Sequence, residues 1–185
     1  MKNNNQKRTF GVVGTVRGSG CTHFSIALAN FLYMVYGKRT ALIELNGSQN
    51  VFDKIRYERK CDDEKVFKIH GVDYYKNAGH EEFVDIYGSD YDYIVIDFGT
   101  YSEKVRKKLV FCTDKCLIAN HTIWKEEENE QTIELINQQM PEVKFKCLTY
   151  FGDDYDRKIY KQIPKLTIPQ VEKQHFPFLM EVVKE

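Results

Sequence analysis

The stretch "GVVGTVRGSGCTHFSIALANFL" (residues 11–32) decides how this chain folds. A short β-branched run comes first, a glycine-rich turn follows, and the segment after it carries apolar residues at helical spacing. These apolar positions fall at i, i+3, i+4, i+7 and i+11, on one helix face: Phe24, Ala27, Leu28, Phe31 and Val35. The stretch therefore predicts a buried strand over 9–14, a tight turn, and an amphipathic helix that ends at Gly37.

Four more apolar runs along the chain predict further buried strands. They are "RTALIEL" (39–45), "YDYIVIDFG" (91–99), "DKCLIAN" (114–120) and "VKFKCLTYF" (143–151). Helical segments are expected between them, near 80–87, 102–111 and 124–140. Strands that alternate with helices favour right-handed crossovers and a parallel sheet with helices on both faces. We therefore expect an α/β fold with a doubly wound, mostly parallel sheet.

One segment interrupts the alternation of strands and helices. The stretch "KVFKIHGVDYY" (65–75) has His70-Gly71 at its centre, which suits a tight turn between two short strands. We expect an inserted β-hairpin there. The last thirty or so residues contain three of the four prolines and predict a loop and a short closing helix. Residues 1–8 are expected to form a disordered lead, and residues 9–185 a single domain.

The composition narrows the class of protein. There are 27 basic and 27 acidic residues, so no global charge attracts a polyanion, and we expect no nucleic-acid partner. No apolar run approaches the roughly 18 residues needed to cross a bilayer. The polar start "MKNNNQKR" has no apolar signal-peptide segment after it. We expect a cytoplasmic protein without membrane attachment, whose five irregularly spaced cysteines are reduced thiols.

The turn at residues 15–22 resembles a phosphate-binding loop that has lost its charge. In the motif G-x-x-x-x-G-K-[ST], backbone N–H groups bind an anion, the lysine adds positive charge, and the hydroxyl binds magnesium. Here the last three positions are Gly20, Cys21 and Thr22, and Thr15 stands at the first glycine position. The backbone donors and the hydroxyl remain, while the lysine is absent. A glycine-rich turn without a ligand is the alternative interpretation.

Three segments resemble the MinD/ParA group of P-loop ATPases, in the class that also holds the nitrogenase iron protein. They are "GTVRGSGCTHFSIALANFLYMVYGKRTALIELN" (14–46), "GSQN" (47–50) and "YDYIVIDFG" (91–99). The resemblance covers residues 9–56 and 89–120 and is weak beyond about residue 140. It implies a P-loop NTPase-like domain in which 91–99 is the Walker B strand, with Asp97 as the carboxylate on the magnesium side.

The chain departs from the family pattern where the family carries charge. The family's loop reads K-G-G-x-G-K-[ST]-T, and here Val16 and Cys21 replace the two lysines. The family's aspartates after the second strand appear as Glu44 and Asn46, so only a longer carboxylate remains. No basic amphipathic helix follows at the C-terminus, so membrane attachment of the MinD kind is not implied.

The resemblance assigns candidate roles to individual residues. Cofactor binding falls on the loop and the start of the helix: Gly18, Ser19, Gly20, Cys21, Thr22 and His23. Thr22 and Asp97 would hold magnesium, while Glu44 and Arg17 are the candidate catalytic groups, the latter as a replacement charge. Simpler interpretations stand beside these roles: Arg17 in solvent, His23 packed on a neighbouring strand, and Cys21 as a small buried filler.

The predicted function is a degenerate MinD/ParA-like nucleotide-binding regulatory or scaffold protein with weak or absent ATP hydrolysis. It would bind ATP or ADP with magnesium at low affinity. Hydrolysis would be slow, since one preorganised donor is typically worth about a hundred- to a thousandfold in rate. The resemblance extends to MinD-like proteins of pilus and secretion loci, which implies a protein partner from localisation or secretion machinery, or a homodimer. Two alternatives remain: an active ATPase that uses Arg17, and a nucleotide-free interaction module.

Overall fold

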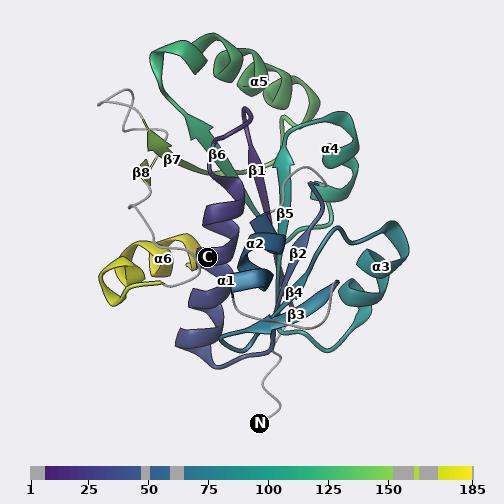
Figure 1. Cartoon of the computed structure of the whole chain (residues 1–185). Coiled ribbons are helices and arrows are strands. Elements are labelled where there is room, and N and C mark those ends of the chain that lie inside the picture. Colours follow the sequence, from purple (N-terminus) through teal and green to yellow (C-terminus); the bar gives the residue numbers. More distant parts are fainter. Residues whose placement is uncertain (1–6, 47–50, 59–64, 152–160, 163–170, 185) are drawn as a thin grey trace.

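The computed structural model describes residues 7–46, 51–58, 65–151, 161–162 and 171–184. Within them, one eight-stranded sheet runs in the order β3-β4-β2-β5-β1-β6-β7-β8 (Figure 1). Its strands are β1 (Arg8–Gly14), β2 (Thr40–Glu44), β3 (Val66–Ile69), β4 (Val72–Tyr75), β5 (Tyr93–Thr100), β6 (Asp114–Asn120), β7 (Lys146–Phe151) and β8 (Lys161–Gln162). Every neighbouring pair is parallel except β3 and β4. The predicted doubly wound, mostly parallel sheet is confirmed.

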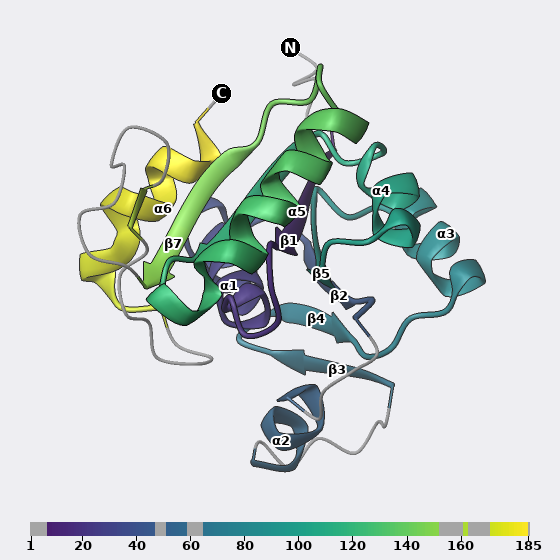
Figure 2. The same ribbon diagram turned by 90° about the horizontal axis from the view of Figure 1, so that it is seen from above.

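Helices cover both faces of this sheet (Figure 2). They are α1 (Cys21–Tyr36), α2 (Val51–Glu58), α3 (His80–Gly88), α4 (Glu103–Leu109), α5 (Glu126–Gln139) and α6 (Phe176–Val183), with 3-10 turns η1 (Ile123–Lys125) and η2 (Lys173–His175). One apolar core lies between the sheet and α1, α2 and α6. A second lies between the opposite face and α3, α4 and α5. Each face of the sheet therefore has its own core.

Helix α1 is buried more completely than its sequence predicts. The apolar stripe predicts one buried face, yet every residue from Phe24 to Leu32 is buried. One reason is α6, which packs beside α1 on the same face of the sheet, with the ring centroids of Phe31 and Phe176 5.4 Å apart. The predicted end of the helix is confirmed, because Gly37 is left-handed (φ 62°) and its N–H donates to the Tyr33 carbonyl at 2.9 Å.

The inserted hairpin is confirmed as β3 and β4. His70 and Gly71 both have positive φ, 49° and 86°, as a two-residue turn between twisted strands requires. The short helix α2, which precedes the hairpin in the chain, was not predicted. Its Phe52 ring lies against the hairpin's Phe67 and Tyr74, at centroid distances of 6.2 and 5.5 Å.

The two ends of the chain differ in part from the prediction. Strand β1 begins at Arg8, inside the segment 1–8 that was expected to be a disordered lead; residues 1–6 lie outside the described residues. Arg8 is ordered because its guanidinium binds the Asp114 carboxylate at 2.8 and 3.1 Å. The short closing helix is confirmed as α6, whereas β8 was not predicted.

Two expectations from composition can be compared with the described residues. Cys21, Cys112, Cys116 and Cys147 are all free thiols, while Cys61 lies outside the described part of the chain. No helix among the described residues is both long enough and apolar enough to span a bilayer.

Candidate functional site

The glycine-rich loop at residues 15–20 connects β1 to α1 at the carboxyl edge of the sheet. Ser19 closes it, because its hydroxyl donates to the Val16 carbonyl at 2.5 Å and accepts from the Val16 N–H at 3.2 Å. Gly18 and Gly20 have φ of 83° and 95°, a backbone region that other residues rarely adopt. The two glycines therefore determine the course of the loop.

Several backbone N–H groups of this loop have no acceptor. Within the described chain, none is found for the N–H groups of Arg17, Gly18, Gly20 and Thr22. The first helical hydrogen bond of α1 runs from the Phe24 N–H to the Gly20 carbonyl, at 2.9 Å. A loop and a helix start with unpaired N–H groups attract an anion, because the partial positive charges of these groups add.

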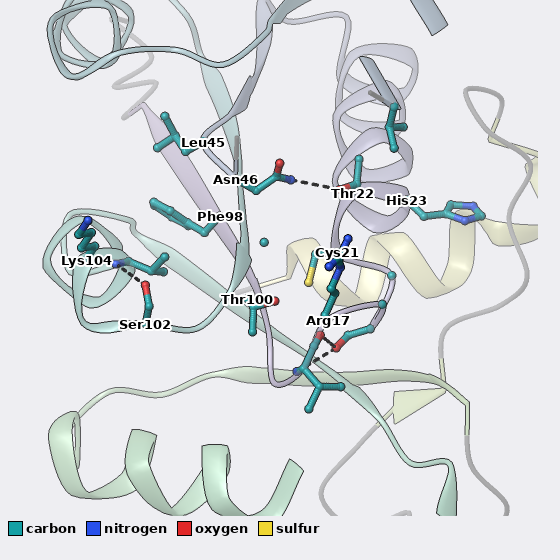
Figure 3. A pocket seen from close by; sticks show the side chains of 17 residues that line it. Arg17, Cys21, Thr22, His23, Leu45, Asn46, Phe98, Thr100, Ser102 and Lys104 are labelled. Carbon is teal, nitrogen blue, oxygen red and sulfur yellow. Dashed lines mark hydrogen bonds between the residues drawn. The ribbon is translucent and has the colours of Figure 1, made fainter. Parts of the chain in front are cut away.

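A cavity of about 680 Å³ opens beside these N–H groups (Figure 3). Residues 16–23 of the loop and of α1 form one wall. Leu45, Asn46 and Val51 form a second, and residues 98–100, 102, 104 and 105 form a third. The loop therefore faces open space that a ligand can enter.

Asp97 lies beneath the loop, where the sequence predicts a magnesium ligand. Its carboxylate is completely buried and accepts three hydrogen bonds: from the Thr22 hydroxyl at 2.6 Å, the Asn46 amide at 2.8 Å and the Gly99 N–H at 3.0 Å. Burial raises the pKa of Asp97 to about 6, although these three donors act in the opposite direction. The structure thus brings Thr22 and Asp97 into direct contact.

A hydroxyl and a carboxylate side by side are oxygen ligands of the kind that Mg²⁺ takes. No group of three or more His, Cys, Asp or Glu side chains suited to a metal occurs among the described residues. A magnesium ion at Thr22 and Asp97 would therefore complete its coordination with water and phosphate oxygens, as is usual for Mg²⁺ beside a nucleotide. Thr22 lines the cavity, whereas Asp97 is completely buried beneath it, so the residues present fit an ion that would contact the Thr22 hydroxyl directly and Asp97 through a water molecule.

Glu44 does not reach the cavity wall, where its predicted role would place it. It is paired in register with Asp97, is 1% exposed, and is absent from the residues that line the cavity. Neither of its carboxylate oxygens makes a hydrogen bond of ordinary geometry with the described residues. Burial, followed by the negative charge of Asp97, raises the pKa of Glu44 to about 7, and the Asn77 N–H and Lys76 offset only part of this.

Three other predicted residues line the cavity. Arg17 is exposed, and its guanidinium has no ion pair or hydrogen bond in the described part of the chain. Cys21 is 7% exposed, and burial of its thiol, together with the nearby Asp97, raises the pKa of that thiol well above the ordinary value. This thiol stays protonated and fills the space over Gly14, where an added Cβ would lie 2.7 Å from the sulfur. His23 is half-buried on the same side of the cavity.

Several lining residues were not predicted as site residues. Asn46 reaches the site, whereas Glu44, two residues earlier, stays beneath it. The position of Asn46 just past the end of β2 was the feature of the sequence that could have predicted this. Thr100, Ser102 and Lys104 lie at the carboxyl end of β5 and the start of α4. That edge of a parallel sheet is where ligands bind, so their place at the end of the apolar run 91–99 was the available signal.

Thr15, at the motif's first glycine position, anchors the loop to the neighbouring strand. Its N–H donates to the Ile118 carbonyl of β6 at 3.0 Å, and its hydroxyl contacts the side chain of Asn129. Asn129 is 1% exposed and also binds the backbone of Asn120. This buried network fixes the loop relative to β6 and α5.

Comparison with known proteins shows which solved structures share this fold. No protein-family model and no curated protein sequence match the chain. A plasmid partition protein from Borrelia burgdorferi, solved bound to AMPPNP, is similar in structure over 95% of this chain and 97% of its own, with 12% identity and a TM-score of 0.65. A ParA family ATPase from Chlorobium tepidum is similar over 88% of this chain and 85% of its own, with 16% identity and a TM-score of 0.61.

A third similar structure is the MinC:MinD cell division protein complex of Aquifex aeolicus. The match covers 76% of this chain and 67% of the chain compared, with 17% identity and a TM-score of 0.52. Structural similarity at such low sequence identity shows a shared fold and nothing more. The chain has the fold of the ParA/MinD P-loop ATPases.

Proposed function

We propose that this protein is a nucleotide-binding regulatory or scaffold protein that binds ATP or ADP with magnesium weakly and hydrolyses it slowly or not at all. The observation that carries the proposal is the set of unpaired N–H groups at Arg17, Gly18, Gly20 and Thr22, which borders an open cavity. Thr22 and Asp97 lie next to this set, with 2.6 Å between the hydroxyl and the carboxylate. Together they offer donors for a phosphate and oxygen ligands for its magnesium.

Low affinity follows from the charges around the cavity. The loop carries no lysine, so its attraction for phosphate comes from backbone dipoles and from the flexible side chain of Arg17. Beneath the loop lie the buried carboxyl groups of Asp97 and Glu44, which repel an anion when they are ionised. A bound magnesium ion would offset that repulsion, with Thr22 and Asp97 holding it.

Slow hydrolysis follows from the groups that face the cavity. An attacking water needs a proton acceptor and a positive charge that stabilises the transferred phosphoryl group. Asn46 stands at the cavity wall, but an amide does not accept a proton at neutral pH. Glu44 could accept one, yet it lies beneath the wall. In this proposal Glu44 is not a catalytic base. By gaining or losing a proton, it sets the net charge of the buried pair that it forms with Asp97.

Calorimetric titration with ATP, ADP and GTP in the presence of magnesium tests binding. We expect measurable heat and a rise in thermal midpoint for at least one nucleotide. Asp97→Asn should weaken the magnesium-dependent part, while Asp85→Asn, an exposed residue of α3 away from the cavity, should not. No heat and no thermal shift at about millimolar nucleotide would leave the nucleotide-free interaction module as the remaining function, since ~1 mM affinity corresponds to about 4 kcal/mol.

The second candidate is an active ATPase that uses Arg17. The observation in its favour is that this arginine lines the cavity and has no partner among the described residues. Steady-state phosphate release that is abolished by both Arg17→Ala and Asp97→Asn would support the enzyme. Release that stays at the background of both variants would support the regulatory protein.

A protein partner or a homodimer is a further part of the proposal. Ile123 and Trp124 of η1 are 86% and 78% exposed, an unusual state for large apolar side chains. The turn η1 follows β6, the strand to which Thr15 ties the loop. The MinD of Aquifex aeolicus was solved in complex with MinC. Light scattering with and without nucleotide, on the wild type and on Trp124→Ala, tests whether this surface mediates self-association.

A further inference from the structure

The charges on the walls of the cavity point to a residue beyond the loop. Among the described residues that line it, Arg17 and Lys104 are the strong cations, and none is acidic. Figure 3 shows these two residues on opposite sides of the cavity, Arg17 on the loop and Lys104 on α4. An anion between the two walls would be attracted from both sides, because like charges across a concave site add their potentials.

Lys104 also differs from the other basic residues of α4. Arg106 binds Glu103 at 2.7 and 2.9 Å, Lys107 lies 4.0 Å from the same carboxylate, and Lys108 lies over the Phe83 ring at 5.5 Å. Lys104 has no acidic or aromatic partner among the described residues. The one basic residue of the helix that lines the cavity is thus the one whose charge is not used within the fold.

The backbone fixes Lys104 close to the loop. The Tyr101 N–H donates to the Gly14 carbonyl at 2.9 Å, which ties the start of α4 to the end of β1. Ser102 caps α4, with its hydroxyl accepting from the Val105 N–H at 3.3 Å. Lys104 therefore projects from a backbone that is held against the strand from which the loop begins.

We infer that Lys104 is a phosphate-binding residue of this site, supplying from across the cavity the positive charge that the loop lacks. The inference rests on the proposed function and names its ligand class more closely. The loop N–H groups bind one phosphate group, and Lys104 binds the next group along the chain. The site is accordingly selective for a polyphosphate chain, as in a nucleoside triphosphate, over a single phosphate.

Calorimetry on the full chain with ATP and with inorganic tripolyphosphate, pyrophosphate and phosphate tests this inference. We expect Lys104→Ala to weaken the binding of ATP and tripolyphosphate roughly tenfold, which is about 1.4 kcal/mol, and that of phosphate much less. Lys104→Arg should retain most of the affinity. Lys107→Ala is the matched control, since it removes an equal charge from the same helix outside the cavity.

The possible results of this experiment separate the inference about Lys104 from the proposed function. If Lys104→Ala binds ATP as well as the wild type does, the inference is wrong and the proposed function stands. Equal losses in Lys104→Ala and Lys107→Ala would also overturn it, because they would report the general charge of α4. A wild type that binds none of the probes would overturn both the inference and the proposed function.

Discussion

Replacing Glu44 by glutamine tests whether a buried carboxyl group makes the fold sensitive to pH. Glutamine has nearly the same shape and cannot ionise, so the variant removes the charge and leaves the packing. Glu44 is 1% exposed, neither of its oxygens makes a hydrogen bond of ordinary geometry with the described residues, and the Asn77 N–H and Lys76 offset only part of the cost of burial. Its ionised form therefore has little to compensate for the loss of water.

The magnitude follows from the pKa. Glu44 has a pKa of about 7 in the folded chain against an ordinary value of 4.5, a difference worth about 3 kcal/mol at ~1.36 kcal/mol per unit. The folded state holds the proton more tightly, so this stabilisation is complete below pH 4.5 and is lost as the pH rises through about 7. Relaxation of the folded chain around the charged group reduces the effect, and we expect a loss of about 2 kcal/mol in the wild type between about pH 5 and about pH 8.

Urea unfolding of the wild type and Glu44→Gln across this pH range, with chelator and without nucleotide, measures the difference. We expect similar stability near pH 5 and a more stable variant near pH 8, by about 2 kcal/mol. Glu134→Gln, at an exposed position of α5, should follow the wild type at every pH. Asp97, whose pKa is about 6, adds a slope at lower pH that all three proteins share. Parallel stability curves for the wild type and Glu44→Gln would refute the reasoning.

Three more perturbations test the loop and its surroundings. Gly18→Ala should cost about 1 kcal/mol in urea unfolding, because φ is 83° there while the space beyond is open, whereas Gly88→Ala, equally open and without positive φ, should cost nothing. Iodoacetamide near pH 8 should modify the half-buried Cys147 before Cys21, judged by peptide mass spectrometry, and early modification of Cys21 would contradict its protonated, buried state. Asn129→Ala should lower stability by about 1–3 kcal/mol, because buried polar groups of Thr15 and Asn120 lose their partner; an unchanged denaturation midpoint would contradict the network.

The parts of the fold that the sequence predicts are those whose burial is visible in a single segment. Strand β5 is a continuous apolar run, and the hairpin has a turn dipeptide between two short strands. Helix α2 has no such signal, because its segment is polar on average and is buried only through Phe52 and Ile55, against a hairpin that comes later in the chain. The full burial of α1 depends likewise on α6, about 150 residues away.

The residues of the candidate site also fall into those that one segment of sequence predicts and those that only the folded chain brings together. The loop residues 18–22 could be predicted, because glycines and a hydroxyl in this order carry the chemistry within one segment. The opposite wall could not, since Lys104 meets the loop only after β5 has been inserted beside β1 in the sheet. For Glu44 the residue type predicted a catalytic carboxylate, but its position inside β2 left the side chain beneath the cavity wall.

The residues around the loop together determine how much charge is buried beneath it. Cys21 stands where the motif has a lysine, and Asp97 beneath it is held by a hydroxyl, an amide and a backbone N–H, none of which is a cation. A buried carboxylate without a cationic partner is stabilised by binding a proton, which is the cause of the raised pKa values of Asp97 and Glu44. Asn46, which donates to Asp97, is neutral and adds no further negative charge beside it. The folded state therefore avoids an unbalanced charge beside the loop, because Asn46 is neutral and Asp97 and Glu44 can each hold a proton. The cations that remain, Arg17 and Lys104, stand at the walls of the cavity, where a ligand can reach them.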